Sequence, residues 1–226
     1  PGTGSGPQGG AGYGGRGDPD GTGAGQPYGD LFRADDPGSG GGVHTGMSGD
    51  AGDGGGNIRI EATGTVRIDG VLTADGESTS LRGGAGAGGG IAVQCDMLTG
   101  GGTIAANGGN GTYTANPNGS ASGGRVALAY RASDFSGGIA VNRGSQGHNV
   151  AWPDYGTVFI VTNEPAPGAT STTNDGTPTV ETELSVARNA GGIAVTRGIA
   201  LWNVGRSLIW SDVSVDLAGS VLTNAA

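Results

Sequence analysis

Acidic side chains on glycine-rich stretches are the first residues of this sequence that could do chemistry. Carboxylate oxygens on flexible loops are the hard ligands that Ca²⁺ prefers. The calcium candidates are Asp18, Asp20, Asp35, Asp36, Asp50 and Asp53. The Gly-Gly-x-Gly-x-Asp nonapeptide of calcium-binding β-rolls is absent, as is the EF-hand spacing. The pattern therefore favours solvated loop acids, with calcium as the alternative and no other cofactor.

A second set of acids could supply the paired carboxylates of a polysaccharide lyase or hydrolase. These acids, near the ends of predicted strands, are Asp69, Asp75, Asp96 and Asp134. Asp69-Gly70 and Asp75-Gly76 are typical of turns, and no neighbouring group is placed to tune an acid/base pair. His44 and His148 stand near no nucleophile motif. We therefore predict no catalytic residues.

Two features of the loops could serve binding. Tyr113, Trp152 and Tyr155 lie among polar residues and could stack on sugar rings, although loop aromatics more commonly anchor a loop to the fold. Arg16-Gly17-Asp18 has the form that integrin ligands use, but chance explains such a tripeptide in a segment this rich in Gly and Asp. Surface glycans are therefore the predicted ligands, if there are any.

The overall composition excludes several classes of partner. The net charge is −9, with 11 arginines and no lysine, which disfavours nucleic acid and anionic membranes. No apolar run approaches the roughly 18 residues of a membrane-spanning helix. Cys95, the single cysteine, excludes an internal disulfide and is expected to be a small buried side chain. The chain starts at Pro1 without a leader and resembles a processed or excised piece, and its glycine-rich, cysteine-poor style suggests secretion or a cell-surface location.

The elements that would position these residues follow from an internal repeat. Short alternating apolar runs follow glycine pairs, and their first apolar positions are Ile58, Ile91, Val126 and Val158, which lie 33, 35 and 32 residues apart. A second strand follows each of the first three runs. These second strands end near Asp75, Asn107 and Asn142, which lie 32 and 35 residues apart. Two independent markers therefore share one period.

Such a unit cannot bury its apolar edge alone, whereas stacked units bury a continuous column. We predict an all-β fold, a parallel, right-handed β-solenoid or β-helix with long glycine-rich loops, and a β-sandwich is the alternative. Asp75, Asn107 and Asn142 should form an Asx ladder at a tight corner. The predicted organisation is a glycine-rich loop layer or leader (1–56), solenoid repeats (57–162), a linker or long loop (163–182) and a compact solenoid continuation (183–226).

The predicted inward ladders contain Ile58, Ile91, Val126 and Val158; Ile60, Val93, Leu128 and Ile160; and Leu72, Ile104, Ile139 and Ile193. The outward positions are charged in the first unit but shrink to alanine in later units, at Ala92, Ala127, Ala129 and Ala140. Small residues let another backbone approach closely. Some glycine loops, including the 1–56 block, are therefore predicted to pack flat on this alanine face.

The order of these blocks resembles that of glycine-rich repeat regions in very large exported bacterial surface proteins. The resemblance covers roughly residues 10–161 and depends on the early glycine block, then Gly-Gly-x-Ile-x-Ile, Val-x-Ile-Asp-Gly-x-Leu, Gly-Gly-Gly-Ile-x-Val and finally Gly-Gly-Arg125-Val126-Ala127-Leu128. It implies parallel β-helical, adhesin-like or stalk-like segments without defined catalytic residues.

These observations predict a non-enzymatic structural or adhesive segment, a rigid spacer or surface fibre that presents glycine-rich loops. The alternative is a glycan-binding or polysaccharide-degrading β-helix. Self-association into a homo-oligomer or fibre is a further predicted partnership, because no residue pattern caps the last strands, up to Leu222-Thr223.

Overall fold

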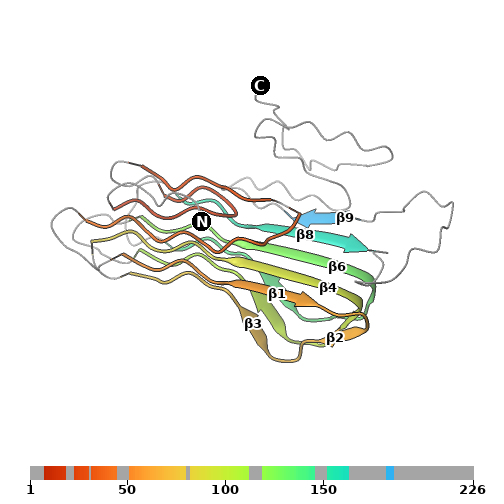
Figure 1. The fold of residues 1–226 in the computed structure, drawn as a ribbon. Coiled ribbons are helices and arrows are strands. Elements are labelled where there is room, and N and C mark those ends of the chain that lie inside the picture. Colours follow the sequence, from red (N-terminus) through yellow and green to blue (C-terminus); the bar gives the residue numbers. More distant parts are fainter. Residues whose placement is uncertain are drawn as a thin grey trace, which may run out of the picture.

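The structure, a computed structural model, describes residues 8–18, 23–30, 32–44, 51–79, 82–111, 119–145, 152–162 and 182–185. These described residues form β-strands and no helix. The strands are β1 (Asn57–Glu61), β2 (Thr65–Arg67), β3 (Val71–Thr73), β4 (Gly90–Thr99), β5 (Thr103–Ala105), β6 (Arg125–Ser133), β7 (Gly138–Ala140), β8 (Thr157–Thr162) and β9 (Thr182–Ser185) (Figure 1).

The strands form two sheets. The larger has the order β1-β4-β6-β8-β9, and β2 also pairs with β4, while the smaller has the order β3-β5-β7. Every pair is parallel except β8 with β9. The fold of the described residues is therefore all-β with parallel sheets, as predicted, and it differs from the β-sandwich alternative, in which neighbouring strands of glycine-rich hairpins would be antiparallel.

The register of the sheets matches the predicted ladders. Ile58 pairs with Ile91, Ile91 with Val126, and Val126 with Val158. The ladders that begin at Ile60 and Leu72 continue in the same way, through Ile160 and Ile139 respectively. Successive passes of the chain therefore stack as layers, about one repeat apart in sequence. Ile193, the last predicted member, lies outside the described residues.

The inward side chains of both sheets form one apolar core. Its most buried members lie in the second and third layers, where Ile91, Ile104 and Leu128 are no more than 2% exposed. Cys95 belongs to the same core, and its burial raises the pKa of its thiol. It is therefore a small buried side chain, as predicted, and not a reactive one.

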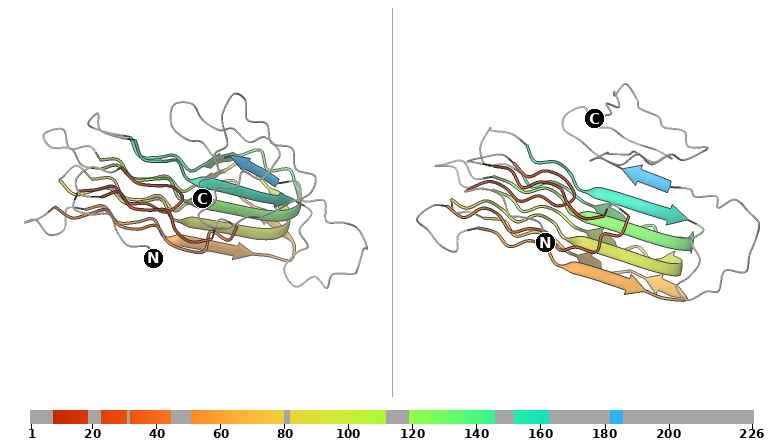
Figure 2. Two further views of the ribbon diagram at one scale, coloured as in Figure 1. Left: turned by 90° about the horizontal axis from the view of Figure 1, so that it is seen from above. Right: turned by 45° about the horizontal axis from the view of Figure 1, so that its top comes forward.

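The glycine-rich stretches lie side by side and extend from the sheets to the left in Figure 1. We call this part the glycine bundle. Its described residues are 8–18, 23–26, 38–42, 51–56, 74–79, 84–89, 106–111, 119–124, 141–145 and 152–156. Figure 2 shows the same stretches running alongside one another from above. The described part of the 1–56 block is therefore an ordered component of the fold.

Residues 84–89 form the centre of the glycine bundle. Their N–H groups donate to three neighbouring stretches in turn, and the pattern repeats every three residues. Gly84 and Ala87 donate to the carbonyls of residues 42 and 39, Ala85 and Gly88 to those of residues 119 and 122, and Gly86 and Gly89 to those of residues 77 and 74. Their carbonyl groups accept from three further stretches, at residues 52 and 55, 11, and 109. A three-residue turn without internal hydrogen bonds is the geometry of a polyproline II helix. This segment therefore bonds to six neighbouring stretches through its backbone alone.

Such close packing requires glycine at its contact points. A Cβ atom added at Gly84 would overlap the carbonyl oxygen of Gly9, and one added at Gly86 would overlap that of Asp53. Four of the alanines, Ala11, Ala85, Ala87 and Ala121, form a small apolar cluster with Tyr13. The glycine excess of the sequence is therefore a packing requirement in this part of the chain.

The prediction that glycine loops lie flat on the alanine face is only partly right. Most described glycines pack on one another, because only their backbones can approach this closely. One stretch does lie near the outer face of the larger sheet: Phe32 packs edge-on against Phe159, with ring centroids 4.8 Å apart. The amide of Asn57 also donates to the Ala34 carbonyl (2.8 Å).

The edge of the larger sheet beyond β8 is covered by β9. Phe159 pairs with Leu184 and Ile160 with Glu183, in antiparallel register. Thr182 is the last residue of the predicted linker, and only Glu183, Leu184 and Ser185 belong to the predicted compact solenoid continuation (183–226), so that prediction stays open beyond these three antiparallel residues. Most of the predicted linker and of the remaining C-terminal segment, with Trp202 and Trp210, lies outside the described residues.

Candidate functional site

The three predicted corner residues are joined by side-chain to backbone hydrogen bonds. The N–H of Asn107 donates to Asp75 Oδ1 (2.6 Å), and the N–H of Asn142 donates to Asn107 Oδ1 (2.8 Å). Each residue follows the end of a strand of the smaller sheet by two positions. The corner therefore links three layers where the sheet passes into the glycine bundle.

A second ladder of the same kind lies three residues further along the chain. The N–H of Asn110 donates to Ser78 Oγ (2.9 Å), and the N–H of Ser145 donates to Asn110 Oδ1 (2.7 Å). These residues have the same spacings, 32 and 35, as the corner residues. That spacing is a signal in the sequence that could have predicted this ladder.

Two of the four carboxylates considered for catalysis, Asp69 and Asp96, are engaged by arginine. Arg67 Nε donates to Asp69 (2.6 Å), and Arg131 binds Asp96 through both Nε (2.6 Å) and Nη2 (2.8 Å). These hydrogen bonds lower the pKa of both carboxyl groups. A general acid needs a raised pKa. Asp69 and Asp96 are therefore suited to holding ion pairs and unsuited to donating protons.

The calcium candidates do not come together in the described part of the chain. Asp18 is 1% exposed, within the glycine bundle, whereas Asp35 and Asp53 are exposed. Asp36 is half-buried, and Asp20 and Asp50 lie outside the described residues. Among described residues, no three His, Cys, Asp or Glu side chains gather as a metal ion would require.

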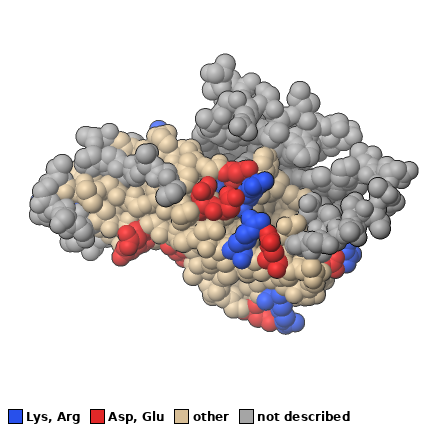
Figure 3. Space-filling model, viewed as in Figure 1, with Lys and Arg blue, Asp and Glu red and all other residues tan. Residues whose placement is uncertain are grey.

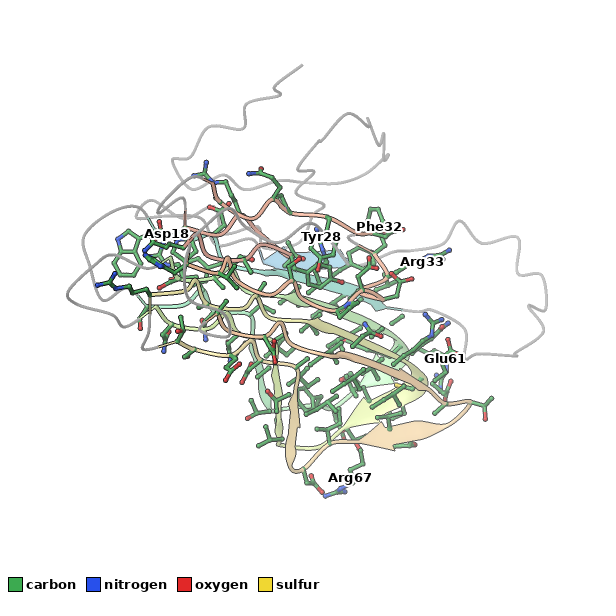
Figure 4. All side chains as sticks on the ribbon, turned by 60° about the vertical axis from the view of Figure 1, so that its left-hand side comes forward. Asp18, Tyr28, Phe32, Arg33, Glu61 and Arg67 are labelled. Carbon is green, nitrogen blue, oxygen red and sulfur yellow. The ribbon has the colours of Figure 1, made fainter. Side chains whose placement is uncertain are left out.

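The Arg16-Gly17-Asp18 tripeptide is built into the fold. The N–H of Gly17 donates to the Gly25 carbonyl (2.9 Å), and the N–H of Asp18 donates to the Ser120 carbonyl (3.0 Å). Figure 4 shows Asp18 within the glycine bundle. Because the Asp18 side chain is buried, the tripeptide is not presented as an integrin-type loop.

A buried arginine connects the N-terminal stretches to the sheet. Arg125, at the start of β6, is 7% exposed and donates to the carbonyls of Tyr13 (3.3 Å) and Tyr28 (2.9 Å). Its guanidinium also lies 5.3 Å from the Tyr13 ring centroid, and burial lowers its pKa. Tyr13 and Tyr28 contact each other, with ring centroids 4.8 Å apart. This cluster has a structural role that the sequence did not reveal.

The group of side chains that most resembles a ligand-binding site is a pair of aromatic rings in contact with one arginine. The Arg143 guanidinium lies 4.4 Å from the Trp152 ring centroid and 4.8 Å from that of Tyr155. Trp152 is 45% exposed even with this contact. The structure thus brings together two of the three predicted sugar-stacking residues and adds Arg143, while Tyr113 lies outside the described residues.

The surface around these features differs between the two parts of the molecule. In Figure 3 the charged side chains of the visible face gather mainly over the middle of the molecule, and the visible glycine bundle is mostly uncharged. No segment of the described residues forms a helix with the length and apolarity to cross a membrane. No family model matches the chain, and no curated protein or solved structure was found to be similar to it.

Proposed function

We propose that this chain is a non-catalytic structural segment of an exported surface protein, a rigid right-handed β-solenoid spacer that presents a glycine bundle. The observation that carries the proposal is the in-register stacking of Ile58, Ile91, Val126 and Val158 across four layers. Crossovers between parallel strands of one sheet are almost always right-handed, which is the basis for the proposed hand.

The stabilising interactions are suited to a load-bearing element outside the cell. Apolar ladders hold the sheets together, side-chain ladders hold the corner, and the backbone holds the glycine bundle. None of these interactions requires a disulfide, which the single Cys95 could not form within the chain. A stack of this kind resists bending because each layer bonds to the next along its whole length.

The solenoid and the surface location can be tested separately. Electron microscopy of the purified chain should resolve layers about 4.8 Å apart along one axis, and the absence of such layers would contradict the solenoid. An antibody against residues 1–226 should label intact cells of the source, and external protease should remove the label. Labelling only after lysis would overturn the surface role.

A second candidate function, glycan binding, is supported by Trp152. Arg143 lies over its ring and holds it beside Tyr155, so an exposed aromatic surface is fixed before any ligand arrives. Fixing the platform in advance lowers the ordering cost of binding. The net charge of −9 disfavours polyanionic sugars, so the proposed ligand class is a neutral polysaccharide.

Calorimetric titration with cellohexaose and chitohexaose as neutral probes, and polygalacturonate as the acidic one, tests this second candidate. A neutral probe should bind, and Trp152→Ala should weaken binding about tenfold, because one stacking contact is lost. Trp152→Tyr should retain most of the affinity. Val71→Ala, at another exposed apolar side chain, is the matched control. Equal affinity of Trp152→Ala and wild type, or binding of the acidic probe alone, would exclude this site.

A further inference from the structure

The first layer of the stack ends in an open edge. Among described residues, β1 and β2 pair only with β4, and β3 pairs only with β5. Ile58, Ile60 and Val66 are half-buried, whereas Ile91, Val93 and Leu98, their partners in the next layer, are almost completely buried. The apolar core therefore reaches solvent at this edge.

Within the described part of the chain, the backbone of this edge leaves hydrogen-bonding groups unpaired at alternate residues. The bonds to β4 use even-numbered residues, since Ala62 N donates to Gln94 (2.9 Å), Ile68 N donates to Thr99 (2.9 Å), and the Gly64 carbonyl accepts from Asp96. Successive residues of a strand direct their N–H and C=O groups to opposite sides. The odd-numbered residues therefore direct both groups away from the stack.

Four of these odd-numbered residues are charged, and their order is self-complementary. Arg59 and Glu61 stand before Gly64, and Arg67 and Asp69 stand after it at matching separations. Within one chain they form the exposed ion pairs Arg59–Glu61 and Arg67–Asp69. A two-fold rotation about Gly64 exchanges position 59 with position 69 and position 61 with position 67. Each arginine thereby takes the position of an acid.

We propose that this edge binds a second copy of the chain about a two-fold axis at Gly64, with the two edges antiparallel. Arg59 of each copy then lies opposite Asp69 of the other, and Glu61 lies opposite Arg67. All four are odd-numbered, so the same register also joins the unused backbone groups. On the inward face it places Ile60 against Ile68.

The bend between β1 and β2 is compatible with this symmetry. In Figure 1 the two strands lie on either side of a turn of the chain, and both pair with the single long strand β4. A two-fold axis through Gly64 that bisects the bend exchanges β1 and β2. In the dimer, β1 of one copy therefore lies beside β2 of the other. The shared interface is therefore isologous.

Charges on an edge strand usually prevent association. Here they favour one register, because only this one places all four charges opposite the other sign. A parallel arrangement places Arg59 opposite Arg59, a shift of two residues places Arg59 opposite Arg67, and β1 against β1 pairs only Arg59 with Glu61. The proposal concerns association of the purified chain, and it does not depend on a surface location or on glycan binding.

Sedimentation equilibrium of the whole chain over a range of concentrations tests the proposal. The wild type should convert from monomer to dimer as concentration rises. Arg59→Glu should raise the dissociation constant at least about tenfold, because the substitution occurs twice per dimer and each time replaces attraction by repulsion. The double variant Arg59→Glu with Asp69→Arg restores both opposite pairs and should recover most of the affinity.

Arg131→Glu is the matched control, because Arg131 pairs with Asp96 on the neighbouring strand β4 and not across the open edge. It should leave the dissociation constant unchanged, and circular dichroism should show that every variant is folded. A monomer at all concentrations would overturn the proposal. So would a dimer that tolerates Arg59→Glu, or one rescued by Glu61→Arg in place of Asp69→Arg, which would indicate β1 paired with β1.

Discussion

The sheets and the glycine bundle are built from the same layers but are held together in different ways. In the sheets, apolar side chains such as Ile91 and Leu128 fill the core that the two sheets share. In the bundle the side chains are mostly absent, and residues 84–89 contact six stretches through backbone groups. One region therefore depends on the size of its side chains, and the other depends on having none.

This difference implies opposite responses to substitution. Removing atoms from the sheet core leaves a cavity, and the cost grows with its volume. Adding a single carbon to the centre of the bundle forces a carbonyl group to move and breaks hydrogen bonds to several neighbours at once. A Gly→Ala substitution at the centre of the bundle should therefore cost more stability than truncation of a large core side chain to alanine in the sheets.

The largest expected effect is that of Gly86→Ala. Its Cβ would overlap the Asp53 carbonyl, so we expect a loss of at least about 3 kcal/mol in the free energy of unfolding, measured by urea denaturation. Gly64→Ala is the control, because no atom lies within 4 Å of the added carbon. At concentrations where the chain is monomeric, Gly64→Ala should be neutral or slightly stabilising. Equal stability of the two variants would contradict the packed bundle.

Truncation of the apolar ladder should have the next largest effect and should depend on the layer. Ile91→Ala, at a fully buried position of the second layer, should cost about 2 to 3 kcal/mol. Ile58→Ala removes the same atoms from the half-buried first layer and should cost about half as much. Thermal or urea unfolding monitored by circular dichroism, at concentrations where the chain is monomeric, compares the two. A larger cost at Ile58 would mean that the first layer is covered.

The sheets could be predicted from the sequence because side chains encode their register. Alternation identified inward residues such as Ile58 and Leu72, and a shared period of 32 to 35 residues aligned the layers. The bundle could not be predicted in the same way. Glycine has no side chain to mark direction, and the partners of residues 84–89 lie at distances that no local pattern specifies.

The clusters around the N-terminal stretches also escaped prediction, for a related reason. Arg125 stands where a strand begins, and its sequence context does not distinguish a solvated side chain from one that donates to two distant carbonyls. Arg143 likewise becomes informative only when the fold brings Trp152 and Tyr155 into contact with it. Aromatic residues in glycine-rich stretches suggested contacts, but they did not identify the partners.

The junction between the two regions contains a group that should make stability depend on pH. Tyr13 is fully buried, and burial raises the pKa of its phenol well above the ordinary value of 10.0. The unfolded chain therefore releases this proton first as the pH rises, so the stabilisation is complete below about pH 10 and is lost above it. We expect the free energy of unfolding to fall by about 1.4 kcal/mol per pH unit above pH 10.

Tyr13→Phe identifies the residue responsible. This variant should be less stable at neutral pH, because the N–H of Asp36 loses its hydrogen bond to the Tyr13 hydroxyl (3.3 Å). Above pH 10 the free energy of unfolding of this variant should fall less steeply than that of the wild type, and the difference in slope should be about that of one titrating proton. Parallel slopes in urea titrations of the two proteins between pH 9 and pH 11 would assign the effect to other groups.

The smallest effect is expected at the Asx ladder, where the sheets pass into the bundle. Asn107→Ala removes the acceptor for the N–H of Asn142 (2.8 Å), and that N–H lies at an exposed residue where water can replace the lost partner. The cost should be about 1 kcal/mol in urea unfolding, the net worth of one hydrogen bond. Asn107→Asp keeps an acceptor oxygen and should stay within a few tenths of a kcal/mol of the wild type. The corner combines side-chain and backbone hydrogen bonds. Its residues should therefore tolerate a different side chain better than Gly86 does, and truncation to alanine better than Ile91 does. A cost at Asn107 as large as at either would mean that the two regions are not separable at this corner.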